Sequence, residues 1–153
     1  MVYKIERVQR LPITIEHAWD FFSSPKNLEE ITPTDMTFEL TSGNGDEKIH
    51  AGQILTYKVA PIGGIKLFWM TEITHVVHHS YFVDEQRRGP YTLWHHKHTF
   101  VEIPGGVEMS DVVWYELPFG FIGRIAHALF VKKKVQAIFD YRFKLLGDKF
   151  GSL

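Results

Sequence analysis

The order of two hydrophobic patterns constrains the fold of this chain more than any other feature. From Met36 to Tyr115 the sequence offers six strand-like segments in succession, separated by short stretches rich in Gly, Pro, Asn or Ser. After Pro118 the pattern changes to one long 3.6-residue period, with apolar positions recurring from Ile122 to Leu146. Strands joined by short turns pair in antiparallel fashion, and a wide apolar helical stripe must be covered. The order therefore predicts an antiparallel sheet that curves around one long helix.

Alternation and turn residues give each segment its bounds. A first strand is expected over residues 2–11, and the other six over 36–40, 53–59, 65–77, 81–87, 93–103 and 107–115. Two short helices follow the first strand, one capped by Thr14 and one opened by Ser24 and Pro25. The long helix is expected over about residues 119–146, with Gly147 as its stop. We predict a single α+β domain over residues 1–153, with a curved seven-stranded antiparallel sheet around the C-terminal helix.

The composition is that of a globular protein with many aromatic side chains. Hydrophobic residues make up 44% of the chain and charged residues 23%, which is ordinary for a soluble domain. The chain also has 12 Phe, 6 Tyr and 4 Trp, so that bulky flat side chains are expected to line an interior space.

Charge and targeting signals exclude several classes of partner. The formal net charge is −1 and the sequence pI about 6.8, which argues against nucleic-acid binding. The three lysines at 132–134 fan out around a helix and indicate a solvated face. The N-terminus has no long apolar run, so no membrane insertion is expected. With no cysteine the chain suits a cytoplasmic location, and nothing in the sequence fixes its oligomeric state.

Polar residues occupy positions of the sheet that should face inward. In "FVDEQRRGPYTLWHHKHTF", residues 82–100, alternation groups Asp84 and Gln86 with Phe82, and His96 and His98 with Trp94 and Phe100. The same alternation turns Asp111 and Tyr115 of the last strand inward. An unpaired charge removed from water costs several kcal/mol, so these groups must bond to one another, lie at a wet rim or meet a ligand.

The element order resembles the helix-grip fold of the SRPBCC superfamily, also called START-like, over essentially the whole chain. The stretch just quoted, together with "MSDVVWYELPFG" and "FDYR", is similar to a bacterial ligand-binding branch of that superfamily. This resemblance implies a cavity for a mostly apolar small molecule. It implies no shared catalytic residue, so no active site is carried over.

Three interpretations of the polar set stay open. The set could be a satisfied structural network, since buried polar groups are generally paired. It could recognise the polar end of an apolar or amphipathic small molecule whose body lies against aromatic side chains and the long helix. It could bind a metal, since His96 and His98 project from one strand face about 6.6 Å apart.

We favour ligand binding, and expect neither a cofactor nor a metal. The candidate ligand-binding residues are Tyr57, Trp69, Asp84, Gln86, Trp94, His96, His98, Asp111, Tyr115, Ile122 and Ala126. Motifs for a serine nucleophile, a zinc protease or a phosphate loop are absent from the sequence. Acid–base catalysis by an Asp and His pair, as in a cyclase or dehydratase, is the alternative, and the sequence does not choose between binding and turnover.

Overall fold

The computed structural model describes residues 1–42, 47–60 and 64–153. Its elements are β1 (Tyr3–Leu11), α1 (Ile15–Phe22), α2 (Pro25–Glu30), a 3₁₀ turn η1 (Thr34–Met36), β2 (Glu39–Leu40), β3 (Ile54–Val59), β4 (Leu67–Val77), β5 (Tyr81–Arg88), β6 (Leu93–Ile103), β7 (Gly106–Glu116), α3 (Gly120–Ala126), a π-helical turn η2 (His127–Val131) and α4 (Lys132–Phe150).

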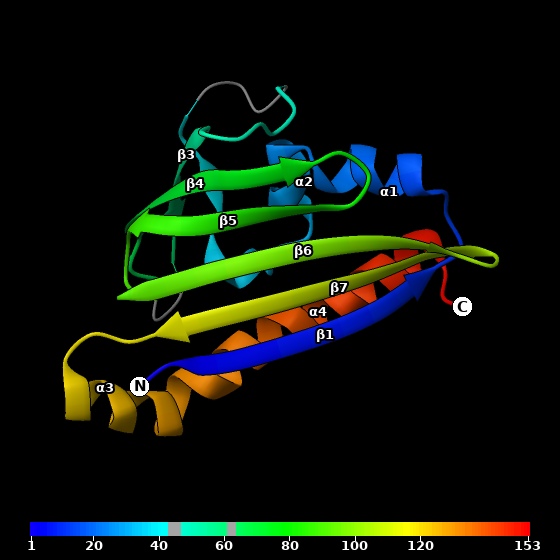
Figure 1. The fold of residues 1–153 in the computed structure, drawn as a ribbon. Coiled ribbons are helices and arrows are strands. Elements are labelled where there is room, and N and C mark those ends of the chain that lie inside the picture. The colour runs from blue at the N-terminus through cyan, green and yellow to red at the C-terminus, as the bar shows by residue number, and fades with distance from the viewer. Residues whose placement is uncertain (43–46, 61–63) are drawn as a thin grey trace.

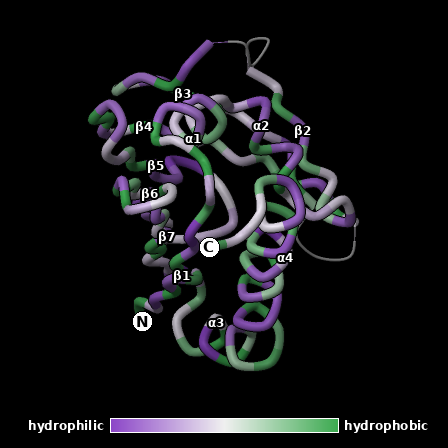
Figure 2. The backbone as a smooth tube through the Cα atoms, turned by 90° about the vertical axis from the view of Figure 1, so that its right-hand side faces the viewer, coloured by the Kyte–Doolittle hydropathy of each residue, from purple (hydrophilic) through white to green (hydrophobic). Residues whose placement is uncertain are grey.

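The seven strands form one antiparallel sheet in the order β1-β7-β6-β5-β4-β3-β2 (Figure 1). Every pair of neighbouring strands is antiparallel, and β1 lies beside the last strand, β7. Turned by 90°, the molecule shows α4 running along one side of the sheet (Figure 2). The predicted helix-grip architecture is confirmed, with the two short helices in the expected place between β1 and β2.

Helix α4 is held against the sheet by one buried stripe. Val135, Phe139, Arg142 and Leu146 follow one another at spacings of four, three and four residues and are all buried. Val135 and Phe139 pack with Val113 and Tyr115 of β7, so the helix covers the face of the sheet that carries the predicted inward residues.

The C-terminal helix differs from its predicted bounds. It continues past Gly147 to Phe150, and Gly151, with a φ of 90°, follows the last helical residue. The extra turn is stabilised by packing, since the ring of Phe150 lies 5.1 Å from that of Phe21 in α1. The prediction that Gly147 ends the helix is therefore wrong.

The predicted strand over 36–40 is much shorter in the structure. Met36 ends the 3₁₀ turn and is buried in the core between β3 and α4, and only Glu39–Leu40 pair with β3. Thr37 between them has a φ of 43°, a left-handed conformation that cannot continue a strand. The tertiary contacts of Met36 override its local strand pattern.

In the described part of the chain, no helix combines the length and apolarity needed to cross a membrane.

Candidate functional site

Four polar side chains from three neighbouring strands meet on the face of the sheet that α4 covers. They are Asp84 on β5, His96 and His98 on β6, and Asp111 on β7. Asp84 lies opposite His96 in the β5–β6 register, and His98 lies opposite Asp111 in the β6–β7 register. Because residues at i and i+2 of a strand share a face, both imidazoles lie between the two carboxylates. We call these four residues the His–Asp cluster.

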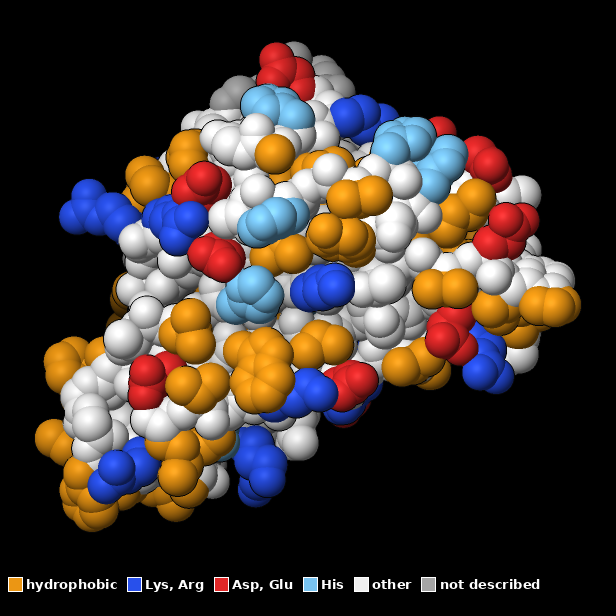
Figure 3. All heavy atoms as spheres, in the orientation of Figure 1, with side chains coloured by type: hydrophobic (Ala, Val, Ile, Leu, Met, Phe, Trp, Pro, Cys, Tyr) orange, Lys and Arg blue, Asp and Glu red, His pale blue; other side chains and the backbone are white. Residues whose placement is uncertain are grey.

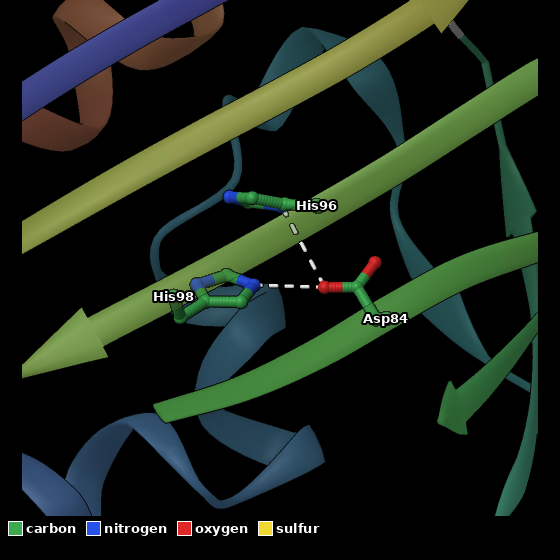
Figure 4. Close-up of side chains that lie close together, drawn as sticks. All are labelled: Asp84, His96 and His98. Carbon is green, nitrogen blue, oxygen red and sulfur yellow. Dashed lines mark hydrogen bonds and ion pairs between the residues drawn. The ribbon is translucent and has the colours of Figure 1, made fainter. Parts of the chain in front are cut away.

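Each imidazole of the His–Asp cluster bridges the two aspartates. Asp84 Oδ2 lies 2.8 Å from His98 Nε2 and 3.6 Å from His96 Nδ1 (Figure 4). Asp111 Oδ1 lies 2.9 Å from His96 Nε2 and 2.9 Å from His98 Nδ1. His98 thus has a carboxylate oxygen within 3 Å of both ring nitrogens, and an imidazole donates from both nitrogens only when it carries two protons.

The pKa values of the two histidines move in opposite directions. Burial lowers the pKa of His98, but hydrogen bonds and charge from Asp111 and Asp84 outweigh it and raise that pKa above its ordinary value. Burial and the neighbouring charge of His98 together hold the pKa of His96 below its ordinary value. His98 is therefore the more readily protonated of the two imidazoles, and His96 the less readily protonated.

The aspartates of the His–Asp cluster stay ionised. Burial would raise the pKa of either carboxyl group, but charge and hydrogen bonds from the two histidines outweigh it. The pKa of Asp84 lies below its ordinary value and that of Asp111 well below it.

Arg142 on α4 is a fifth polar residue of this region, and the sequence analysis missed it. Its side chain is buried, its guanidinium carbon lies 5.4 Å from the ring centroid of Phe139, and its charge acts on Asp111 and Asp84. One signal could have found it. Arg142 stands three residues after Phe139 and four before Leu146, so a charged residue occupies the apolar stripe of the helix.

A cavity of about 360 Å³ lies between the sheet and the helices, and the His–Asp cluster and Arg142 form part of its wall. The rest of the wall is mainly apolar. It includes Phe22, Leu28, Phe38, Leu55, Tyr57, Val59, Trp69, Ile73, Tyr91, Trp94, Ile138 and Phe139. Burial and the charge of Asp84 raise the pKa of Tyr57, so its hydroxyl keeps its proton. The cavity therefore combines a mainly apolar wall with the charged side chains of the His–Asp cluster and Arg142.

Seven of the eleven predicted site residues line this cavity, namely Tyr57, Trp69, Asp84, Trp94, His96, His98 and Asp111. The structure brings them together from β3, β4, β5, β6 and β7.

The other four predicted site residues are not in the described wall of the cavity. The Gln86 amide donates to the carbonyl of Tyr91 and accepts from its N–H, which holds the β5–β6 turn. Tyr115 is buried, and its hydroxyl lies 2.9 Å from His127 Nε2. Ile122 is 70% exposed on α3, and Ala126 is half-buried at the end of that helix.

The His–Asp cluster also includes the ligand set of a possible metal site. One ligand atom each from Asp84, His96 and His98 can be chosen within 4.8 Å of one another. An ion bound there would separate Asp84 from His98. It would also displace a proton from His98, because a metal binds a deprotonated ring nitrogen.

Comparison with known proteins shows the fold. No protein-family model and no curated protein matches the sequence. Among solved structures, protein CV1439 from Chromobacterium violaceum is 13% identical with a TM-score of 0.73, and the match covers 98% of each chain. A START superfamily protein from Mycobacterium smegmatis is 14% identical with a TM-score of 0.69, over 96% of each chain. Norcoclaurine synthase from Thalictrum flavum, as a point mutant with a transition state analogue, is 17% identical with a TM-score of 0.65, over 97% of this chain and 96% of that one. The chain thus has the START-like fold that the sequence resemblance implied.

Proposed function

We propose that this protein binds a mostly apolar small molecule in the cavity between the sheet and the C-terminal helix, with the His–Asp cluster fixing the polar end of the molecule. One observation carries the proposal: a largely aromatic and aliphatic cavity of about 360 Å³ has the His–Asp cluster and Arg142 in its wall. Small-molecule sites have this design, with an apolar body for affinity and a few convergent polar groups for orientation. The absence of cysteine supports a cytoplasmic setting for this binding.

A titration calorimetry experiment with 1-decanol tests the proposal. We expect saturable binding to the wild-type protein. Ile138→Trp should weaken it by tenfold or more, about 1.4 kcal/mol, because Ile138 lines the cavity and the larger ring occupies it. Ala137→Trp is the matched control, because Ala137 is exposed one residue away on the same helix. No binding to the wild-type protein, or equal binding by both variants, contradicts the proposal and favours a purely structural role for the cluster.

The second candidate is a cyclase or dehydratase that uses an Asp and His pair. The observation that favours it is a pair of imidazoles on the cavity wall with ring centroids 3.7 Å apart, in which the pKa of His98 is raised and that of His96 is lowered. Two such groups can serve as an acid and a base. A protein of this fold that is named as a synthase makes the chemistry reasonable. Mass spectrometry of a molecule that co-purifies with the protein separates the two candidates. Conversion of that molecule by the wild-type protein, lost in His96→Gln, supports catalysis, and an unchanged mass supports binding.

A further inference from the structure

Arg142 is the one cation of the cavity wall that is buried without a partner among the described residues. The residue is only 9% exposed, and its Nε makes no hydrogen bond. None of the ion pairs found in the described residues includes it, although the charges of Asp84 and Asp111 act on it from a distance. The nearer partners of both carboxylates are His96 and His98. Leaving a buried charged donor unsatisfied is costly, so the fold alone gives no reason to keep a guanidinium here.

The surroundings of Arg142 within the protein satisfy little of its bonding capacity. A small space of about 10 Å³, with Gln9, Asp111 and Arg142 among its walls, has room for about one water molecule. A guanidinium carries five N–H donors in a planar fork, and a single water can accept from one or two of them. The remaining donors need an acceptor, and Arg142 also lines the large cavity.

The charges around Arg142 allow an anion to approach. Asp84 lies 2.8 Å from His98 Nε2, and Asp111 lies 2.9 Å from both His96 Nε2 and His98 Nδ1. Both aspartates are held by histidines, which leaves Arg142 as the unpaired charge. A guanidinium pairs best with a planar group that carries one negative charge. A carboxylate is such a group, because its two oxygens can accept two parallel hydrogen bonds from the guanidinium. Lys134, the only lysine among the described residues of the cavity wall, already pairs with Asp35 at 2.7 Å.

We propose that the ligand of this cavity is an amphipathic carboxylate whose carboxylate group is bound by the guanidinium of Arg142, while its apolar body lies against the aromatic wall. This inference rests on the proposed function, because it names the chemical class of the molecule that the cavity takes. It adds that Arg142, rather than the His–Asp cluster alone, selects that class.

The test compares decanoate, 1-decanol and decylamine by titration calorimetry. The wild-type protein should bind decanoate at least tenfold more tightly than either other probe. Arg142→Gln should lose tenfold or more of the affinity for decanoate and keep that for 1-decanol within about twofold. Lys144→Gln is the control, because it removes an exposed cation from the same helix and should change neither affinity.

The three probes separate a failure of the carboxylate inference from a failure of the proposed function. Equal binding of decanoate and 1-decanol by the wild-type protein overturns the inference and leaves the proposed function standing, whereas no binding of any probe overturns both. If a thermal melt shows that Arg142→Gln does not fold, Arg142→Lys replaces it. That variant keeps the charge but loses the planar fork. Its preference for decanoate over 1-decanol should therefore be smaller than that of the wild-type protein. An unchanged preference in the folded Lys variant counts against carboxylate recognition by the fork.

A separate feature of the molecule lies on the outer surface of α3 and η2. Large apolar side chains that are 43% to 80% exposed gather there, namely Phe119, Phe121, Ile122, Ile125, Leu129 and Phe130. They form much of the hydrophobic surface at the lower left of Figure 3, where α3 projects beyond the sheet in Figure 1. Ile122 and Ile125 lie three residues apart on α3, and Leu129 and Phe130 lie in η2, which continues from it, so the surface spans two consecutive helical elements. Contiguous exposed apolar surface of this kind marks a binding site for a partner or a membrane.

The charge pattern around these side chains identifies the partner. Residues 117–139 contain no Asp or Glu, but they contain Arg124 and the lysines at 132–134. Arg124, Lys132 and Lys133 take part in none of the ion pairs found in the described residues. An apolar helix face flanked by unpaired cations is the pattern of helices that lie in the interface of an anionic membrane. A second copy of the chain would bring like charges together about a twofold axis, which disfavours self-association through this face.

We infer that the surface from Phe119 to Lys133 docks onto anionic phospholipid. A helix that lies on the membrane is compatible with the expectation that the chain does not insert across it. The protein should float with vesicles of phosphatidylcholine and phosphatidylglycerol, but not with phosphatidylcholine alone, and high salt should release it. The double variant Phe121→Ser and Ile122→Ser should lose this binding. Val101→Ser, which removes an exposed apolar residue from β6, should keep it.

Two results contradict the lipid assignment. One is that the protein floats with neither type of vesicle. The other is a dimer of the wild-type protein in size-exclusion chromatography that the same double variant converts to monomer, since this would show that a second copy covers the surface. Binding that is equal for both variants would place the contact elsewhere on the molecule and also contradict the inference.

Discussion

His96 and His98 stand two residues apart on β6 with ring centroids 3.7 Å apart, and their surroundings move their pKa values in opposite directions. We therefore expect two separate titrations in NMR spectra of the imidazole nuclei. The midpoint of His98 should lie above the ordinary value of 6.5 and that of His96 below it. Assignment comes from His96→Gln and His98→Gln, each of which removes one of the two curves. Two midpoints on the same side of 6.5 would contradict the charge distribution described above.

The same shifts predict how stability depends on pH. His98 binds its proton more tightly in the folded state, so its contribution to the free energy of unfolding is fully present below pH 6.5 and is lost as the pH rises through its raised pKa. His96 binds its proton less tightly when folded, so its contribution is present above pH 6.5 and is lost as the pH falls through its lowered pKa. The combined contribution of the pair is greatest near pH 6.5. Urea unfolding across this range, in the wild-type protein and the two Gln variants, measures it.

His98→Phe should destabilise the protein by about 2 to 5 kcal/mol, because it leaves Asp84 and Asp111 buried with only His96 as a hydrogen-bond donor among the four residues of the cluster. His95→Phe is the matched control. His95 is the next histidine along β6, but it lies on the opposite face with Glu85 and is about one-third exposed, so its loss should cost no more than about 1 kcal/mol. Chemical denaturation gives both values. A free energy of unfolding that is unchanged or raised in His98→Phe would contradict this prediction and show that His98 does not stabilise the fold.

Alternation along the strands carries enough information to predict the cluster. A strand has a period of two residues and its partners follow from short turns, so Asp84, His96, His98 and Asp111 had to share a face once the sheet was antiparallel. The structure places the four side chains together. What the alternation could not supply is which nitrogen faces which carboxylate, because that depends on rotamers and on the exact twist of the sheet.

Helical periodicity is less informative here, for two physical reasons. Arg142 was overlooked because Tyr141 and Phe143 beside it look like members of the apolar stripe, although both are exposed and Arg142 is buried. Ile122 was expected in the cavity because apolar residues at helical spacing predict burial against some surface. The sequence cannot say whether that surface is the sheet of the same chain or an external partner, and α3 extends past the sheet (Figure 1).

Tyr115→Phe tests whether Tyr115 acts in packing rather than in the cavity. The hydroxyl of Tyr115 lies 2.9 Å from His127 Nε2, and His127 stacks on Tyr3 with ring centroids 3.4 Å apart. Removing the hydroxyl should lower the free energy of unfolding by about 0.5 to 1.5 kcal/mol. The affinity for 1-decanol should stay the same, because Tyr115 is outside the described cavity wall. A lower affinity for 1-decanol with an unchanged free energy of unfolding would show that Tyr115 contributes to ligand binding.

Metal content gives the last prediction, and it depends on the protons of the His–Asp cluster. A transition metal at Asp84, His96 and His98 must displace a proton from His98, whose pKa is raised because both of its nitrogens face carboxylates. It must also break the 2.8 Å contact between His98 and Asp84. We therefore expect protein purified without a histidine tag to contain less than one equivalent of zinc, iron, nickel or copper in elemental analysis, and its melting temperature to be insensitive to a chelator. About one ion per chain, lost in the double variant His96→Ala and His98→Ala, would show that these three residues form a metal site.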